Sequence, residues 1–382
     1  MTSLLRDLDK LLGSRLATLI SNEYESAAAA SSGFGANPHD NRFIETNLVS
    51  DGLEPAANID PKLINPWGVA ESPTGPFWVS DNGSGLSTLY SSNGTPQPLV
   101  VTIAVPPGQA TPAGVTGQVF NSFGTSNPTA FVVDGKPASF IFATEDGTIS
   151  AWNAAAGKAS VLMVDNSSNP FEGTGGHGAV YTGLAIASSG QGPTLYAANF
   201  NHGTVDVFNG DFQQIGSFTD TSLPKGYAPY NVQELNGSLY VTFAKQDATQ
   251  TGSVSALHAG YVDQFSLNGA LIARVGSGGP LDAPWGLAIA PSSFGAFAGD
   301  LLVGNFGSGQ IDAYNPKTSH FDGAVRDQDG KPLVIGDLWS LSTGNGGNGG
   351  SASTVYFTAG VQNEAHGLFG ALNLAPNLTK VA

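Results

Sequence analysis

One phrase recurs six times along this chain: a glycine followed five residues later by an aromatic or large apolar residue. Successive glycines lie 62, 56, 57, 49 and 58 residues apart, a period near that of the longer propeller repeats and too long for most helical solenoids. Each copy stands at the turn of a strand-turn-strand pattern. The repeat therefore predicts an all-β, six-bladed β-propeller. Its copies are Gly85 to Tyr90, Gly147 to Trp152, Gly203 to Phe208, Gly260 to Phe265, Gly309 to Tyr314 and Gly367 to Leu372.

The order of strands within a blade also follows from the sequence. Each repeat opens on a phrase with small residues at its head, such as Asn65-Pro66-Trp67-Gly68, which suits the crowded innermost strand. A second apolar strand follows, and the aromatic residue after the glycine is expected to pack between blades. The sixth repeat ends short of an outer strand, so we expect Phe43 to Val49 to complete the last blade and remove an exposed edge.

Composition narrows the class of protein. Fifty-one glycines, 23 prolines and 12% charged residues in 382 positions are typical of an all-β chain with many tight turns. The formal charge of -16 disfavours nucleic acid and anionic membranes as partners. The absence of cysteine excludes disulfides and thiolate chemistry, and no run of 18 apolar residues predicts a transmembrane segment.

The N-terminal segment is expected to be organised differently. Leucines from Leu4 to Leu19 recur at steps of three and four, which predicts an amphipathic helix within residues 1–26. Residues 27–42 are expected to be a flexible linker, and the propeller to occupy residues 43–382. The apolar stripe of the helix would pack on the propeller, mediate self-association, or dock on another protein or a membrane surface.

Several longer phrases carry a resemblance to a known family. They include Asn65-Pro66-Trp67-Gly68, Thr144-Glu145-Asp146-Gly147, Ala198-Asn199-Phe200, Ala283-Pro284-Trp285-Gly286, Gly304-Asn305-Phe306-Gly307 and His366-Gly367-Leu368-Phe369. In these phrases the chain resembles a family of largely uncharacterised bacterial propeller proteins, related in architecture to NHL-repeat and lactonase-type propellers. The family resemblance implies an extracytoplasmic location. This sequence shows neither a cleavable signal peptide nor the sorting tail that several family members carry, which leaves the location open.

Polar residues follow the second strands of the repeats and are expected to converge at one mouth of the axis. The aligned positions are Asp81, Glu145, Asn199, Lys245, Asn305 and Gly360. Glu364, Trp67 and Trp285 are expected beside them, which gives a predicted ligand site of Asp81, Glu145, Asn199, Lys245, Asn305, Glu364, Trp67 and Trp285.

Three alternatives remain for this mouth. Asp81, Glu145, Asn199 and Asn305 offer the oxygen ligands that Ca²⁺ prefers, and the resemblance to lactonase-type propellers implies an axial calcium. Lys245 could instead neutralise the carboxylates in a structural ion-pair network, or the mouth could bind a metal-free ligand. His202 and His366 are the candidate general bases.

Two functions are consistent with these features. The first is a non-catalytic propeller that binds a protein, a glycan or a surface polymer through its polar mouth. The second is a calcium-dependent lactonase or hydrolase. The sequence contains no G-x-S-x-G, H-E-x-x-H or P-loop motif, which disfavours serine-hydrolase, zincin and nucleotide-hydrolase activities.

Overall fold

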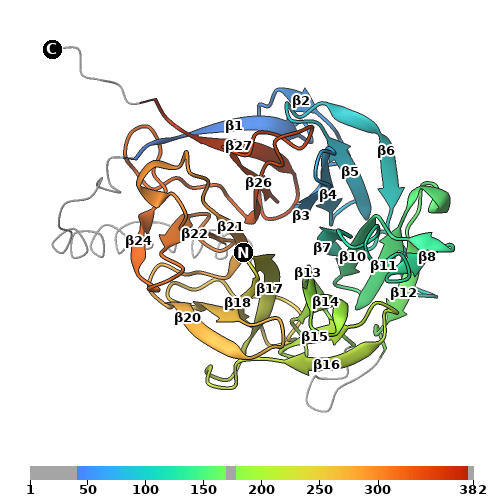
Figure 1. Cartoon of the computed structure of the whole chain (residues 1–382). Helices are drawn as coiled ribbons and strands as arrows, with labels where there is room; N and C mark the ends of the chain where they lie inside the picture. The colour runs from blue at the N-terminus through green and yellow to red at the C-terminus, as the bar shows by residue number, and fades with distance from the viewer. Residues whose placement is uncertain (1–40, 169–177, 377–382) are drawn as a thin grey trace, which may run out of the picture.

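The computed structural model describes residues 41–168 and 178–376, which form six β-sheets arranged in a ring around one axis (Figure 1). This arrangement confirms the predicted six-bladed β-propeller. Within these ranges the helical turns are η2 (Ala154–Ala156) and η3 (Gly295–Phe297), both of the 3-10 type. The predicted N-terminal helix and residues 27–40 of the predicted linker lie outside the described residues. No described helix is long and apolar enough to cross a membrane.

The first five blades are antiparallel four-stranded sheets whose strands follow chain order from the axis outward, and the last blade takes its outermost strand from the start of the described chain. The innermost strands are β3 (Pro66–Glu71), β7 (Val115–Phe120), β13 (Tyr181–Ser189), β17 (Tyr227–Leu235), β21 (Pro284–Ile289) and β25 (Leu338–Thr343). The second strands are β4 (Phe77–Asp81), β10 (Phe140–Thr144), β14 (Gly192–Asn199), β18 (Ser238–Lys245), β22 (Leu301–Asn305) and β26 (Val355–Ala359). Both sets coincide with the predicted first and second strands to within a few residues.

The outer half of each blade completes the pattern. The third strands are β5 (Leu86–Tyr90), β11 (Thr148–Trp152), β15 (Thr204–Phe208), β19 (Gly260–Phe265), β23 (Ile311–Tyr314) and β27 (Leu368–Leu374). The outermost strands are β6 (Pro96–Thr102), β12 (Val161–Asp165), β16 (Gln214–Phe218), β20 (Leu271–Ser277), β24 (Phe321–Ala324) and β1 (Phe43–Ser50). A short β2 (Asn58–Ile59) extends the last sheet, and β8 (Val132–Val133) pairs with β9 (Lys136–Pro137) in a separate hairpin.

The two ends of the described chain close the ring, as predicted. Strand β1 pairs antiparallel with β27 from Phe43 opposite Leu374 to Ser50 opposite Leu368. Figure 1 shows the blue β1 lying beside the red β27. Because β1 supplies the outer strand that the sixth repeat lacks, the edge of β27 is paired instead of exposed.

The repeated glycine and aromatic residue have the predicted roles. Gly85 and Gly147 have φ angles of 67° and 80°, a left-handed conformation that favours glycine at the turn. In five blades the residue five positions later lies opposite the first or second residue of the second strand, as Tyr90 lies opposite Phe77. In blade three Phe208 lies opposite Leu195, the fourth residue of the longer β14. These side chains are at most 7% exposed and contact the preceding blade. Trp152, for example, lies 5.0 Å from Trp78 between ring centroids.

Backbones of neighbouring innermost strands approach closely around the axis. A Cβ atom added at Gly117 would lie 2.4 Å from the backbone nitrogen of Leu184, and one added at Gly68 would lie 2.5 Å from the carbonyl oxygen of Thr116. In the fourth blade Asn231 occupies the equivalent position, and its Nδ2 donates to the carbonyl of Trp285 at 2.9 Å. The ring of inner strands therefore depends on small residues and one bridging carboxamide at this level.

This close approach can be tested by adding a single methyl group. Gly117→Ala should lower the free energy of unfolding by about 1–3 kcal/mol, the usual cost of overpacking, because the neighbouring atoms belong to backbone. Gly216→Ala on the outer strand β16 is the matched control, since nothing lies within 4 Å of its added Cβ. Urea denaturation of both variants gives the comparison. Equal stabilities would contradict the proposed constraint.

Candidate functional site

Four aromatic side chains meet on the axis and close it. Trp67, Tyr230, Trp285 and Trp339 stand at the same position in the innermost strands of blades one, four, five and six, and we call them the aromatic plug. Trp67 stacks on Trp339 with ring centroids 3.5 Å apart and contacts the edge of Trp285 at 6.1 Å. The four residues are only 1–4% exposed. The propeller axis is therefore blocked at this level and not an open channel.

Hydrogen bonds fix the plug in place. Trp285 Nε1 donates to the carbonyl of Thr182 in the third blade at 2.9 Å. Trp339 Nε1 donates to Oδ1 of Asn65 at 2.9 Å. Trp67 Nε1 is buried and has no hydrogen-bond partner among the described residues. The predicted ligand residues Trp67 and Trp285 thus form the floor of the mouth, and their rings are not a surface on which a ligand can stack.

Directly beside the plug, a chain of side-chain hydrogen bonds joins two carboxylates. Asn82 Nδ2 donates to Oε2 of Glu145 at 2.8 Å, and Asn65 Nδ2 donates to Oδ1 of Asn82 at 3.3 Å. Asn65 Nδ2 also donates to Oε2 of Glu364 at 3.0 Å. We call Asn65, Asn82, Glu145, Glu364 and the hydroxyl of Tyr230 the mouth cluster. Its members come from blades one, two, four and six.

The backbone places these residues in conformations that side chains seldom adopt. Asn65 has a φ of 46°, and Glu364 is the third of three consecutive left-handed residues, with φ angles of 59°, 58° and 65°. Non-glycine residues pay a conformational cost there, which the surrounding contacts must offset. The Glu364 amide donates to the carbonyl of Gly360 at 2.6 Å, and the Asn65 amide to that of His366 at 3.1 Å. The strained turn therefore holds Glu364 against Asn65.

The electrostatics of the cluster are those of two carboxylates held near one another. The pKa of Glu145 is raised to about 7, mainly by burial; the hydrogen bond from Asn82 lowers it, and the charges of Glu364 and Asp146 add smaller increases. Burial also raises the pKa of Tyr230, with smaller contributions from Glu364 and Glu145. Its hydroxyl accepts a hydrogen bond from Ser253 Oγ at 3.0 Å. A pocket of about 400 Å³ adjoins Glu145 and is lined in part by Gln109, Asp146 and Thr251.

The residues predicted to form a ring do not all reach the mouth. Asp81, Asn199 and Asn305 occupy equivalent register positions, opposite Pro66, Tyr181 and Pro284. All three are fully buried. Asn199 Nδ2 and Asn305 Nδ2 donate to Asp206 and Asp312 of their own third strands, each at 2.8 Å. Their hydrogen-bonded polar atoms are engaged within blades one, three and five, and Asp81 Oδ1 is buried without a hydrogen-bond partner among the described residues.

The other three ring positions are displaced along the strand. In blade six the register equivalent is Ala359, opposite Leu338, so Gly360 lies one residue further along. The register equivalent of Asp81 in blade two is Thr144, opposite Val115, so Glu145 lies one residue further along. In blade four the equivalent is Phe243, opposite Pro229, so Lys245 lies two residues further along and is exposed. Of the six aligned positions, Glu145 is the one whose side chain joins the mouth cluster. Ligand binding by the others stays a prediction.

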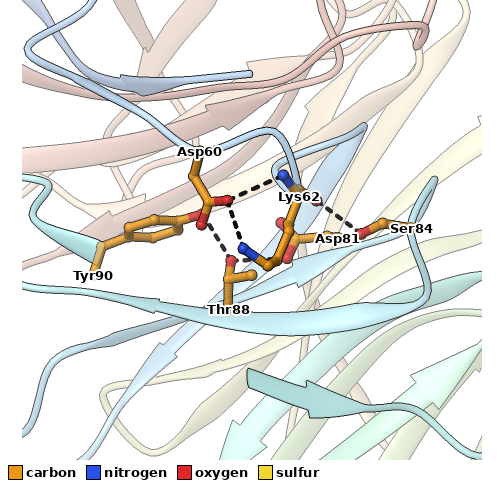
Figure 2. A network of polar contacts seen from close by, with 6 residues as sticks. All are labelled: Asp60, Lys62, Asp81, Ser84, Thr88 and Tyr90. Atoms are coloured by element: carbon orange, nitrogen blue, oxygen red, sulfur yellow. Dashed lines mark hydrogen bonds and ion pairs between the residues drawn. The ribbon is translucent and has the colours of Figure 1, made fainter. Parts of the chain in front are cut away.

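Asp81 belongs to a separate buried network (Figure 2). Thr88 Oγ1 lies 2.8 Å from Asp81 Oδ2 and 2.9 Å from the hydroxyl of Tyr90, which donates to Asp60 at 3.2 Å. Asp60 in turn pairs with Lys62 Nζ at 3.3 Å.

Asp81 accepts within this network. Thr88 Oγ1 donates to Asp81 Oδ2 at 2.8 Å. Burial raises the pKa of Asp81 well above its usual range, and the hydrogen bond from Thr88 opposes that effect. Burial therefore disfavours the charged form of Asp81.

In the described part of the chain, few side chains at the predicted calcium site are placed to act as ligands. Among residues 41–168 and 178–376, no group of three or more acidic or histidine side chains is close enough to hold a metal ion. Asp81, Asn199 and Asn305 face their own blades, and Glu145 alone faces the mouth. Calcium binding by Asp81, Glu145, Asn199 and Asn305 stays a prediction.

The two candidate bases lie near the mouth in different settings. His366 Nδ1 lies 2.6 Å from Asp51 Oδ2, and its ring is partly exposed. His202 follows Asn199, whose Oδ1 accepts from the His202 amide at 3.3 Å. Burial lowers the pKa of His202, and the charge of Asp206 opposes that effect. A role as general base stays a prediction for both.

Sequence reasoning missed two members of the mouth cluster. Asn65 and Tyr230 were part of the phrases that open blades one and four, but neither was assigned a role in the site. The signal was available: Trp67, Tyr230, Trp285 and Trp339 stand at the same position of their phrases, and aromatic residues at one level of a propeller must meet on its axis. The residue two positions before a ring residue then borders the mouth, as Asn65 does before Trp67.

Comparison with known proteins identifies relatives, and these relatives are uncharacterised. No protein-family model matches the chain. The uncharacterized protein L690 of Acanthamoeba polyphaga mimivirus is 31% identical over 333 residues, which cover 85% of this chain and 84% of the relative. The uncharacterized protein R648 of the same virus is 29% identical over 333 residues, covering 85% and 78%. The relatives are viral, so the expected bacterial origin of the family is not supported.

Solved structures with a similar shape are distant. A streptogramin B lyase is 11% identical, with a TM-score of 0.48, and the match covers 88% of this chain and 98% of the lyase. A chain of a nidogen–laminin complex is 14% identical, with a TM-score of 0.45, covering 75% and 82%. Likeness this remote carries no inference about activity. The identity and coverage shared with L690 do establish a relationship, and this chain belongs to the family of six-bladed propellers that includes that mimivirus protein.

Proposed function

We propose that this chain is a non-catalytic binding propeller that receives a basic side chain of a protein partner at the mouth cluster. The observation that carries the proposal is the hydrogen-bonded chain from Glu145 through Asn82 and Asn65 to Glu364, beside a closed aromatic floor. The proposal rests on the chemistry of these groups and on their common location.

The cluster has the donors and acceptors that a cation requires. Glu145 lines the pocket beside the plug, and Glu364 is exposed to solvent. The carboxamides of Asn82 and Asn65 link the two carboxylates and use their Nδ2 groups to hold them in position. A lysine ammonium brings three donors and an arginine guanidinium five, all directed at acceptors of this type. Binding such a group would also relieve the repulsion between Glu145 and Glu364, which raises the pKa of Glu145 in the free protein.

A protein partner suits the site better than a glycan does. Sugar rings commonly bind on exposed aromatic faces, whereas the plug rings are only 1–4% exposed. The formal charge of -16 attracts basic partners over long range and speeds their encounter. A surface polymer would fit the same argument only if it carried amino groups.

Charge-neutral substitutions in the cluster provide the first test. Glu145→Gln and Glu364→Gln should each weaken binding of an acetylated tetralysine amide by about fivefold or more, because each removes one of the two charges that face the cation. Fluorescence anisotropy of a labelled peptide at fixed ionic strength measures the dissociation constants. Asp329→Asn is the matched control, since it makes the same change in net charge at an exposed loop position.

The Asp329→Asn control distinguishes binding at the mouth cluster from a general attraction of the peptide to the net charge of the protein. A change of less than about twofold for Asp329→Asn, beside larger losses for the two cluster variants, supports the proposal. Equal weakening in all three variants would show that the peptide responds only to net charge. No measurable binding by the unmodified protein would also overturn a lysine-binding mouth.

The raised pKa of Glu145 predicts a pH-dependent difference in stability. A carboxyl whose pKa is higher in the folded protein contributes stability below its unfolded pKa, and loses it as pH rises through the folded value of about 7. Glu145→Gln removes this titration while keeping the shape. The variant should therefore gain stability relative to the wild-type protein between pH 5 and pH 8, as measured by urea denaturation at each pH. A constant difference across that range would contradict the assignment.

Asp81 separates the binding proposal from the calcium-dependent alternative. Asp81→Asn keeps an oxygen that accepts from Thr88 and removes a charge that burial disfavours, so the free energy of unfolding should change by less than about 1 kcal/mol. Blades three and five already carry Asn199 and Asn305 at this register position. Asp81→Ala should cost about 1–3 kcal/mol, because it leaves the Thr88 and Tyr90 hydroxyls short of a partner. Urea denaturation with calcium and with chelator checks both variants.

A calcium site at Asp81 predicts a different effect of calcium on the stability of the same variants. Replacing a charged ligand by Asn would weaken calcium binding, so a calcium-dependent gain of stability in the wild-type protein would shrink in Asp81→Asn. That outcome would favour the metal-dependent hydrolase. Stability that is independent of calcium, with Asp81→Asn close to wild type, would favour the binding propeller.

A further inference from the structure

One backbone hydrogen bond recurs around the axis and marks equivalent positions at the mouth. In every blade, the first residue after the second strand donates its amide to the carbonyl of the residue just before the innermost strand, at 2.8–3.1 Å. Blade four extends both strands by two residues, so Ala244, opposite Ala228, takes the equivalent position there. We call these six positions, which lie next to the plug on the mouth side, the mouth ring: Asn82, Glu145, Phe200, Ala244, Phe306 and Gly360.

The mouth ring contains two phenylalanines, and the structure covers one of them. Phe200 and Phe306 are each followed, in the next blade, by a small residue, Ala244 or Gly360. The extended strands of blade four cover Phe200: Gln246 Nε2 donates to the Phe200 carbonyl at 2.6 Å, and Phe200 is fully buried. Blade six has no such extension, and Phe306 is partly exposed. The mouth ring therefore presents one aromatic side chain to a ligand.

Phe306 is the end member of a stack of three rings. Its ring centroid lies 4.2 Å from that of Trp339, with the two planes 27° apart, and Trp339 in turn stacks on Trp67 at 3.5 Å. Because Trp339 covers one face of Phe306, the accessible part of the side chain is the opposite face and the edge. The plug holds this ring in place before a ligand arrives, so binding to it costs little ordering entropy.

A carboxylate lies at the next position of the mouth ring. Gly360 has no side chain there, and a Cβ atom added to it would collide with Asn65 Oδ1. The Asn65 carboxamide fills this space, and its Nδ2 donates to Glu364 at 3.0 Å. The Glu364 amide also donates to the Gly360 carbonyl at 2.6 Å. Two hydrogen bonds therefore hold Glu364 at the blade-six position, next to Phe306 of blade five.

A second carboxyl group belongs to the same corner of the mouth. Asp337 is the residue whose carbonyl accepts from the Gly360 amide, and its Oδ2 accepts from the Asn363 amide at 2.7 Å. It stands two residues before Trp339, as Asn65 stands two residues before Trp67. The junction of blades five and six thus combines one accessible aromatic ring with two acidic side chains.

We propose that the basic side chain received at the mouth is an arginine, whose guanidinium plane stacks on Phe306 while its N–H groups bond to Glu364. This inference rests on the proposed function, because it names the side chain that the mouth cluster receives. A guanidinium is planar, weakly hydrated and suited to stacking on an aromatic face, whereas a lysine ammonium is a compact and strongly hydrated charge. An aromatic ring beside a carboxylate therefore favours arginine over lysine at equal charge.

Two peptides of equal charge test this preference. Acetylated tetraarginine and tetralysine amides are compared by fluorescence anisotropy at one fixed ionic strength. The wild-type protein should bind the arginine peptide at least about fivefold more tightly. Phe306→Leu keeps an apolar side chain but removes the aromatic face, so the preference should fall below about twofold, mainly through weaker binding of the arginine peptide. Phe120→Leu is the matched control, since Phe120 is also partly exposed but lies at the end of β7 away from the mouth.

A measurement on the wild-type protein covers the case in which Phe306→Leu does not fold. Nuclear Overhauser contacts between the ring protons of Phe306 and the δ-methylene protons of the bound arginine peptide should be observed. The same arginine protons should shift upfield, because they lie over an aromatic ring. Absence of both signals in a saturated complex would overturn the proposal without any variant.

The outcomes separate this inference from the proposed function. Equal affinity for the two peptides, a preference for lysine, or a preference for arginine that persists in Phe306→Leu would each overturn the arginine assignment. If Glu145→Gln and Glu364→Gln still weaken binding, the basic-side-chain site itself stands. No measurable binding of either peptide by the wild-type protein would overturn the proposed function together with this inference.

Discussion

The close approach of six innermost strands around one axis determines most of what this molecule can do. Neighbouring backbone atoms that would come within about 2.5 Å of an added Cβ leave room for glycine, serine or a single bridging asparagine at that level. The next side chains along the strands are then forced into the axis together, where Trp67, Tyr230, Trp285 and Trp339 fill it. A propeller with larger spacing would keep a channel, whereas this one has a solid wall with a polar space on each side.

Buried carboxyl groups separate into two kinds in this structure, and the difference lies in their partners. Asp81 has a raised pKa, yet it belongs to a buried network in which it accepts a hydrogen bond from Thr88. Glu145 also has a raised pKa, but it lines a pocket. A perturbed pKa alone does not mark a binding site, because structural networks perturb it too. The informative combination is a perturbed carboxyl group together with space that a ligand can enter.

The sequence predicted the fold closely because the relevant signals are local and repeated. Each glycine and its aromatic partner fix one turn and one buried contact, so six copies determine six blades, and the incomplete last repeat predicts the closing strand β1. The site was harder to predict, since a side chain's direction depends on register. One residue of shift turns a side chain to the other face of a strand, and the inner strands carry bulges, as β7 does between Val115 and Gln118, which pair with Thr144 and Phe142. Alignment by sequence alone therefore grouped Glu145 and Lys245 with Asp81, although the structure separates all three.

Asn65 links the mouth cluster to the aromatic plug, and through the plug to the cavity of about 330 Å³ on its other side. Its Oδ1 accepts from Trp339 of the plug, and its Nδ2 donates to both Asn82 and Glu364 of the mouth. Trp339 contacts Trp285, which borders the cavity on the other side. Because every polar atom of Asn65 is committed and its backbone is held in a left-handed conformation, it has little freedom to move. The plug and Asn65 thus give both spaces a shared rigid wall, and a binding group fixed to such a wall pays little ordering entropy when its ligand arrives.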